Sequence, residues 1–399
     1  MVSAYAELEE RMRGRLAGRE CLYVPSCRFG LYLALRHWCR PGGRVLMSPV
    51  NDDVIFFVVL AAGLRPVQAP LDPRDGSIDT AAVPDSVWQG LSAVLTTNLY
   101  GNPDPAPGLR SRCDRSGIPL IEDAAHAIGS TVGGRPVGTY GEASVFSLSK
   151  HTAAKAGGFL TLADPALRGE LAAARDALLH PTRAAAELAY LTRPYAEAAL
   201  RGLRLARAAR ATVRLLGLDE RKEIRMPLRA DELARALPAA PALDPFDSWV
   251  RVDMHDYRLR PGAGRLRRTT GKLARLDDVL ATHRDGTARL LASEYGTPGA
   301  PREVAQPLFR VPLLVEERDT AIVALARQRI TTGYVYDPPL DRYAGEAFTE
   351  PSAAPGPAAW FARHALPVDP RHADEALAVL RTAGIRPASH LSAAPEGAR

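Results

Sequence analysis

Lysine is scarce in this sequence. The 399-residue chain has 51 basic residues, and only four of them are lysines: Lys150, Lys155, Lys222 and Lys272. A GC-rich genome would also deplete lysine, but it does not explain why two of the four persist within the stretch FSLSKHTAAKAGG, residues 146–158. Lysine can lose its proton when buried and attack a carbonyl, whereas arginine stays protonated. The stretch is therefore predicted to carry a nucleophilic lysine.

The sequence also lacks paired cysteine motifs, long apolar runs and a signal peptide, and these absences exclude several protein classes. The four cysteines show no CxxC spacing, which excludes a disulfide framework and a zinc site in a chain of this size. No apolar run reaches about 18 residues, so no membrane span is expected. The start, MVSAYAELEERMRGRLAGRE, is polar and helical and does not resemble a signal peptide. We therefore expect a cytoplasmic protein without a membrane partner.

The net charge of +6 raises the question of an acidic partner. The segment 164–216 is an atypical helical segment in which arginines recur at three- and four-residue steps, at 201, 204, 207, 210 and 214. This spacing places them on one helix face. Without interleaved aromatic residues or a nucleic-acid motif, a solvated face or a subunit contact is favoured. No nucleic-acid partner is predicted.

The order of apolar segments indicates an α/β fold. Strands are predicted at 44–49, 64–72, 92–101, 117–125 and 142–149, with a helix at 54–63. This alternation is typical of a mostly parallel sheet that binds ligands at the carboxyl ends of its strands. We assign 1–245 to a large domain and 246–399 to a smaller C-terminal α/β domain. The second contains one long helix at 267–296, a segment at 310–315, a helix at 318–328, a segment at 333–337, and a final helix at 373–384.

The strand end IEDAAHAIGS, residues 121–130, combines two carboxylates with a histidine. A buried carboxylate requires a cation or a hydrogen-bond donor, so Asp123 is a candidate partner for a protonated heterocycle. The alternative for Asp123 is a cap at a strand-to-helix turn. Lys150 follows 27 residues later. An amine that can attack a carbonyl and an acid that keeps a pyridine nitrogen protonated are the two groups that pyridoxal phosphate needs.

The chain resembles the DegT/DnrJ/EryC1/StrS family of fold-type-I pyridoxal-phosphate enzymes. The resemblance rests on EDAAHAIGS, GGRPVG, GEASVFSLSK and the following Gly-Gly, and it extends to LYGNP and to the C-terminal segments. It implies transamination of a keto sugar, a keto-cyclitol or a related small keto substrate, with an amino acid as donor. It also implies a homodimer.

The resemblance assigns a role to each candidate site residue. Counting back seven residues from Gly157 gives Lys150 as the Schiff-base lysine and leaves Lys155 on the surface or the phosphate side. Asp123 would hold the pyridine nitrogen protonated, and His126 would lie near the phenolic oxygen. The remaining cofactor contacts would be Ser147 and the helix start at Ser26, Cys27 and Arg28 for the phosphate, with Asn98 as a further polar contact. No metal is expected.

The sequence departs from the family pattern at two places near the predicted site. The phosphate loop reads Ser26-Cys27-Arg28 instead of Ser-Gly-Thr, and the run at 50–53 is Val-Asn-Asp-Asp, without the usual stacking aromatic residue. Two alternatives therefore stay open. One is another pyridoxal-phosphate reaction on the same scaffold, such as dehydration. The other is a non-catalytic relative that binds the cofactor or a protein partner.

Overall fold

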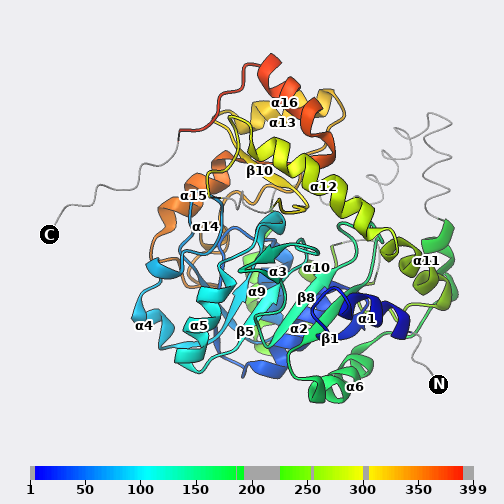
Figure 1. The fold of residues 1–399 in the computed structure, drawn as a ribbon. Helices are drawn as coiled ribbons and strands as arrows, with labels where there is room; N and C mark the ends of the chain where they lie inside the picture. The colour runs from blue at the N-terminus through cyan, green and yellow to red at the C-terminus, as the bar shows by residue number, and fades with distance from the viewer. Residues whose placement is uncertain (1–4, 186, 193–224, 253–255, 300–304, 390–399) are drawn as a thin grey trace.

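The computed structural model describes residues 5–185, 187–192, 225–252, 256–299 and 305–389 (Figure 1). The arginine face predicted at 201–214 lies outside these residues. The largest element is a seven-stranded sheet in which only β9 runs against its neighbours. In spatial order its strands are β1 (Glu20–Val24), β9 (Gly158–Leu162), β8 (Ala143–Ser147), β5 (Leu120–Asp123), β4 (Leu91–Thr96), β2 (Arg44–Met47) and β3 (Arg65–Gln68). The predicted mostly parallel sheet is confirmed, and its strands β1 and β9 were not predicted from the sequence.

Alternate residues of the central strands enter two different hydrophobic clusters. Val45, Ala93 and Ile121 pack with α2 (Cys27–Trp38) and α3 (Asp53–Ala61). Leu46, Val94 and Leu120, which point to the opposite face, pack with α5 (Ala106–Ser116). Successive side chains of a strand point to opposite faces, so both faces of the sheet are covered by helices. This arrangement leaves the carboxyl ends of the strands as the place where polar side chains can meet.

The C-terminal part builds a second, smaller core around a β-ribbon. Strands β10 (Val311–Leu314) and β11 (Ala365–Val368) pair antiparallel. Leu313 and Leu366 pack in one cluster with side chains of α12 (Leu276–Leu291), α13 (Arg318–Arg327) and α16 (Ala373–Thr382). Figure 1 shows these helices gathered at one end of the molecule, above the sheet.

One prediction for this part was wrong. The helix predicted at 267–296 is two helices, α11 (Ala263–Leu273) and α12, which begins after Arg275. Lys272 in the last turn of α11 and two aspartates in the first turn of α12 suit a helix end followed by a helix start. Residues 333–337 form neither a helix nor a strand, and β11 is the partner of β10.

The remaining described helices are short. They are α1 (Ala6–Arg13), α4 (Asp85–Trp88), α6 (Arg168–Leu178), α9 (Ala230–Ala236), α10 (Asp247–Val250), α14 (Leu340–Ala344) and α15 (Pro355–His364). Trp249 of α10 and Leu340 of α14 pack in the same cluster as α3. Residues on both sides of position 245 thus contribute to the core beside the sheet, and the domain boundary at 245–246 stays a prediction. None of the described helices has the length and apolar character needed to cross a membrane.

Candidate active site

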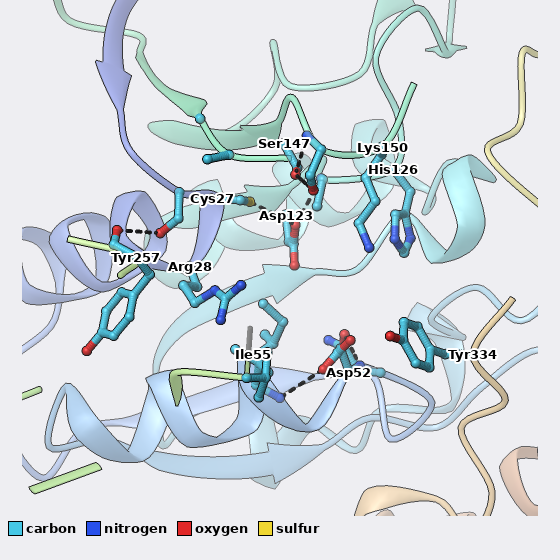
Figure 2. Close-up of a pocket in the computed structure, with 18 of the residues that line it drawn as sticks. Cys27, Arg28, Asp52, Ile55, Asp123, His126, Ser147, Lys150, Tyr257 and Tyr334 are labelled. Atoms are coloured by element: carbon cyan, nitrogen blue, oxygen red, sulfur yellow. Dashed lines mark hydrogen bonds between the residues drawn. The ribbon is translucent and has the colours of Figure 1, made fainter. Parts of the chain in front are cut away.

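A cavity of about 350 Å³ lies at the carboxyl ends of the parallel strands. Seven of the eight predicted site residues line it: Ser26, Cys27, Arg28, Asp123, His126, Ser147 and Lys150. Figure 2 shows Asp123, His126 and Lys150 along one side of this cavity, and Asp52, Ile55 and Tyr334 along the facing side. The structure therefore brings together residues from four separate strand ends and from the C-terminal part.

Asp123 is the last residue of β5, and its side chain is buried at the floor of the cavity. Its Oδ1 accepts a hydrogen bond from the backbone N–H of Ala125 at 3.0 Å and lies 4.0 Å from Sγ of Cys27. Burial raises the pKa of the Asp123 carboxyl to about 7, and the backbone hydrogen bond opposes this shift. A buried carboxyl with a raised pKa is expected to bind a cation strongly, because a nearby positive charge favours its ionised form.

Lys150 lies in the turn that follows β8, and its side chain is half-buried at the cavity wall. Its Nζ lies 5.5 Å from the centre of the Phe309 ring. Burial lowers the pKa of the Lys150 ammonium, while the nearby Asp52 carboxylate opposes this effect. A lowered pKa increases the fraction of free amine at neutral pH, which both nucleophilic attack and proton transfer require.

The glycine pair at 157–158 brings the chain back beside the start of α2. A Cβ on Gly158 would lie 2.3 Å from the carbonyl oxygen of Phe146 and 3.1 Å from the backbone nitrogen of Cys27. Gly157 has a φ of 98°, in the region that favours glycine. Both positions therefore require glycine. Lys155 also lines the cavity, but its side chain is exposed. The assignment of the nucleophile to Lys150 instead of Lys155 stays a prediction.

His126 stacks with two aromatic rings. Its imidazole stacks on Phe309, with centroids 5.1 Å apart, and on Tyr100, with centroids 6.3 Å apart. Burial lowers the pKa of His126 well below its usual range, and the charge of Lys150 adds to this effect. The imidazole is therefore neutral at physiological pH, and the flanking rings leave its edge to face the cavity.

These rings belong to a longer stack, which we call the aromatic column. In order, it consists of Arg310, Phe309, His126, Tyr100, Tyr336 and Arg225. The guanidinium of Arg310 lies 4.3 Å from the Phe309 ring centre, and that of Arg225 lies 5.6 Å from the Tyr336 ring centre. Stacked rings and cation–π pairs each add stabilisation beyond area burial. The column joins residues near the sheet to residues of the C-terminal part. Of the residues in the column, only His126 was predicted from the sequence as a site residue.

Asn98 differs from the prediction, because it does not line the cavity. Its side chain is fully buried, and its Nδ2 donates to the backbone carbonyl of Asp123 at 2.8 Å and to Oγ1 of Thr96 at 3.0 Å. Its backbone adopts a left-handed conformation with φ of 44°. Asn98 thus fixes the end of β5 that carries Asp123, and it contacts no ligand space directly.

The start of α2 uses its own side chains for capping and packing. Oγ of Ser26 accepts from the backbone N–H of Phe29 at 3.3 Å and donates to the carbonyl of Tyr257 at 3.0 Å. Arg28 donates to the carbonyl of Val250 at 2.6 Å. Ser147 and Ser149 share a hydrogen bond of 2.8 Å between their hydroxyls. An anion at this end of the cavity would meet the positive end of a 12-residue helix.

The two adjacent aspartates of the 50–53 run have different environments. Asp53 is fully buried and pairs with Arg225, and its other oxygen accepts from the backbone N–H of Met226 at 2.7 Å. Asp52 lines the cavity and caps α3, because its Oδ1 accepts from the backbone N–H of Val54 at 3.0 Å. Only one of the two carboxylates therefore faces the site. In the described part of the chain, no group of three or more His, Cys, Asp or Glu side chains could hold a metal ion.

Comparisons with known proteins show what this chain is similar to. Residues 3–186 match the model of the DegT/DnrJ/EryC1/StrS aminotransferase family. The UDP-N-acetyl-3-dehydro-alpha-D-glucosamine 3-aminotransferase of Acidithiobacillus ferrooxidans is 32% identical over 37% of this chain and 41% of its own. The L-glutamine:scyllo-inosose aminotransferase of Streptomyces griseus is 38% identical over 32% of this chain and 31% of its own. The chain thus spans less than half the length of these curated relatives.

The structural likeness is more extensive than the sequence likeness. The E. coli GDP-4-keto-6-deoxy-D-mannose-3-dehydratase, solved with bound hydrated PLP, superposes with a TM-score of 0.67. The superposition covers 96% of this chain and 92% of the dehydratase at 16% identity. The fold-type-I α/β architecture predicted from the sequence is confirmed. Residues 3–186, slightly less than half of the chain, are thus similar to the DegT/DnrJ/EryC1/StrS aminotransferase family, and the shared fold extends over nearly the whole length of the chain.

Proposed function

We propose that the protein is a pyridoxal-phosphate-dependent aminotransferase that transfers an amino group from an amino acid to a keto sugar, a keto-cyclitol or a related small keto substrate. The observation that carries the proposal is that a buried carboxyl, Asp123, and an amine of lowered pKa, Lys150, line one cavity at the sheet edge. The two curated relatives support the acceptor class, since their names describe aminotransferases of a sugar nucleotide and of a cyclitol ketone.

The residues of the cavity fit pyridoxal phosphate. Asp123 is a buried carboxyl whose raised pKa would be relieved by a protonated ring nitrogen, so both groups would be ionised when paired. The phosphate would bind at the start of α2, where the helix dipole and Arg28 provide positive charge, beside Ser147. His126 would pack its edge against the ring.

Each side chain then has a limited task in the reaction. When bound, pyridoxal phosphate supplies an electron sink for the electron pair that a departing proton leaves on the substrate carbon. Nζ of Lys150 would take up that proton and deliver it to the cofactor side within the same half of the reaction, and in the second half it would move a proton back to the acceptor carbon, since burial favours its free amine. Asp123 holds negative charge beside the ring nitrogen. The stacked contacts with Phe309 and Tyr100 fix the orientation of the His126 imidazole.

Borohydride reduction of the cofactor-loaded protein, followed by peptide mass mapping, tests the assignment of the lysine. We expect a pyridoxyl label on Lys150 and none on Lys155, because Lys150 is half-buried at the cavity wall and the side chain of Lys155 is exposed. The chain has only four lysines, so each labelled peptide is assigned without ambiguity. A label on Lys155 would show that the register is shifted. A protein without any label would favour the non-catalytic alternative.

The pH dependence of folding tests the environment of Asp123 in the cofactor-free protein. The pKa of Asp123 is about 7 in the folded state, against about 3.9 when unfolded, so the folded state binds more protons between these values. Stability is therefore lost as the pH rises through this window. In Asp123→Asn this loss is absent, so the variant should gain about 2 to 3 kcal/mol relative to the parent between pH 5 and pH 8. Urea unfolding at both pH values measures the difference. Parallel pH curves for the two proteins would contradict the assignment.

We also propose that the enzyme works in the cytoplasm as a homodimer. The reducing compartment is supported by the four cysteines, which are all buried free thiols. The dimer is supported only by the resemblance to the family. Light scattering coupled to gel filtration measures the mass directly, and a mass near 43 kDa would exclude the dimer.

A further inference from the structure

Lys150 faces charged and ionisable groups from several elements. Arg28 on α2 and Arg310 before β10 carry positive charge and lower the pKa of Lys150, while the carboxylate of Asp52 raises it. Cys27 on α2 and Asp123 at the end of β5 are the other acidic groups near the amine, and His126 is its neutral neighbour after β5.

Of the three acidic groups, two are poorly suited to balance the charge of Lys150. Burial and the Asp123 carboxylate raise the pKa of the Cys27 thiol well above its usual range, so this thiol is uncharged at neutral pH. Asp123 has a pKa of about 7 and is therefore only partly ionised at neutral pH. In the proposed function, its charge is also directed to the ring nitrogen of the cofactor. Asp52 is the remaining acidic group.

The backbone fixes Asp52 in its position. It is the N-cap of the nine-residue helix α3, and its Oδ1 is held by the N–H of Val54 at 3.0 Å. Arg225 also holds this turn, because it donates to the carbonyl of Asn51 at 2.6 Å and to the side chain of Asp53. Figure 2 shows Asp52 on the side of the cavity opposite Lys150, pointing inward. A carboxylate held this way has little freedom to turn towards bulk water.

We propose that Asp52 is a positioning residue that serves as the counter-ion of Lys150 across the cavity. This inference rests on the proposed function for its role in catalysis. There, Asp52 offsets Arg28 and Arg310, so that Lys150 can still take up a proton from the substrate carbon instead of remaining a permanently neutral amine. The proton is held at Nζ of Lys150, and Asp52 stays ionised throughout.

The experiment measures the titration of Lys150 in the full-length cofactor-free chain, so it requires neither substrate nor turnover. The rate of lysine modification by trinitrobenzenesulfonate is followed against pH, and each lysine is resolved by peptide mass mapping. In Asp52→Asn, the pH of half-maximal rate at Lys150 should fall by about one unit. The rate at a fixed pH below this midpoint should therefore rise about tenfold. Asparagine caps helices as well as aspartate, so α3 keeps its cap in this variant.

Two controls show whether the shift is specific to Asp52 and Lys150. Lys155 is modified in the same samples, and its profile should not change. Asp256→Asn removes a different cavity carboxylate, one that is bonded to Nδ1 of His180 at 2.6 Å, and it should leave Lys150 unchanged. An unshifted Lys150 in Asp52→Asn would overturn the proposal. So would an equal shift at Lys155 or in Asp256→Asn, because the effect would then not belong to the pair. A protein that shows the shift but lacks aminotransferase activity would refute the proposed function alone.

Discussion

Lys150→Arg is expected to lose transaminase activity almost completely while keeping its fold. Arginine preserves the positive charge but cannot give up its proton at neutral pH, so both the attack on the cofactor and the proton transfer fail. Proton transfer by a positioned side chain contributes roughly 10² to 10⁴-fold, and the loss should reach or exceed the upper end because the same amine also holds the cofactor. The half-reaction with L-glutamate or L-glutamine, followed by the change in cofactor absorbance, measures it.

Lys155→Arg is the matched control for this variant. It lies five residues further along the same turn segment and lines the same cavity, but its side chain is exposed. Its rate should stay within a few-fold of the parent. Equal losses in both variants would mean that the segment, and not the amine of Lys150, is sensitive to substitution. Full activity in Lys150→Arg would refute the mechanism.

Arg225→Met is expected to cause the largest loss of stability. Arg225 is buried, pairs with the fully buried Asp53, and donates to the carbonyls of Asn51, Tyr336 and Pro338. Its removal leaves the Asp53 carboxylate buried without its cation, and breaking such a pair costs about 3 to 5 kcal/mol. Urea unfolding of the two proteins at pH 7 gives the difference in the free energy of unfolding.

Arg11→Met provides the contrast within the same chain. Arg11 and Glu7 form an ion pair of 3.1 Å on α1, but both side chains are largely exposed. Exposed pairs of this kind contribute less than about 1 kcal/mol. If Arg225→Met were no more destabilising than Arg11→Met, the pair with Asp53 would not be the anchor of the 51–53 turn, and the fixed position of Asp52 would need another explanation.

The features that could be predicted from the sequence are those with a local signal. Short apolar runs separated by turns marked five of the seven sheet strands, and Asp123 and Lys150 stood directly after such runs. The residues that complete the site come from elsewhere. Asp53 and Arg225 are 172 residues apart, and no sequence pattern in either segment predicts their contact. Phe309 reads as one apolar residue before a strand, and only the fold shows that its ring lies beside Lys150 and His126.

Asn98 shows why a polar residue at a strand end is an ambiguous signal. The same position can serve a ligand or the backbone of the neighbouring strand, and both uses favour an amide. Here the left-handed backbone of Asn98 turns its side chain towards the carbonyl of Asp123 and the hydroxyl of Thr96. The sequence does not indicate whether the Asn98 side chain points to a ligand or to the neighbouring strand.

The aromatic column has a consequence for how the protein could be divided. Two of its four rings, Phe309 and Tyr336, and both terminal arginines lie beyond residue 186, where the match to the family ends. A fragment that stops there would keep Asp123 and Lys150, but His126 would lose its stacked contact with Phe309. The part of the chain that matches the family model is thus not an independent catalytic module, and gene fusions or truncations that end at residue 186 would lack part of the lining of the site.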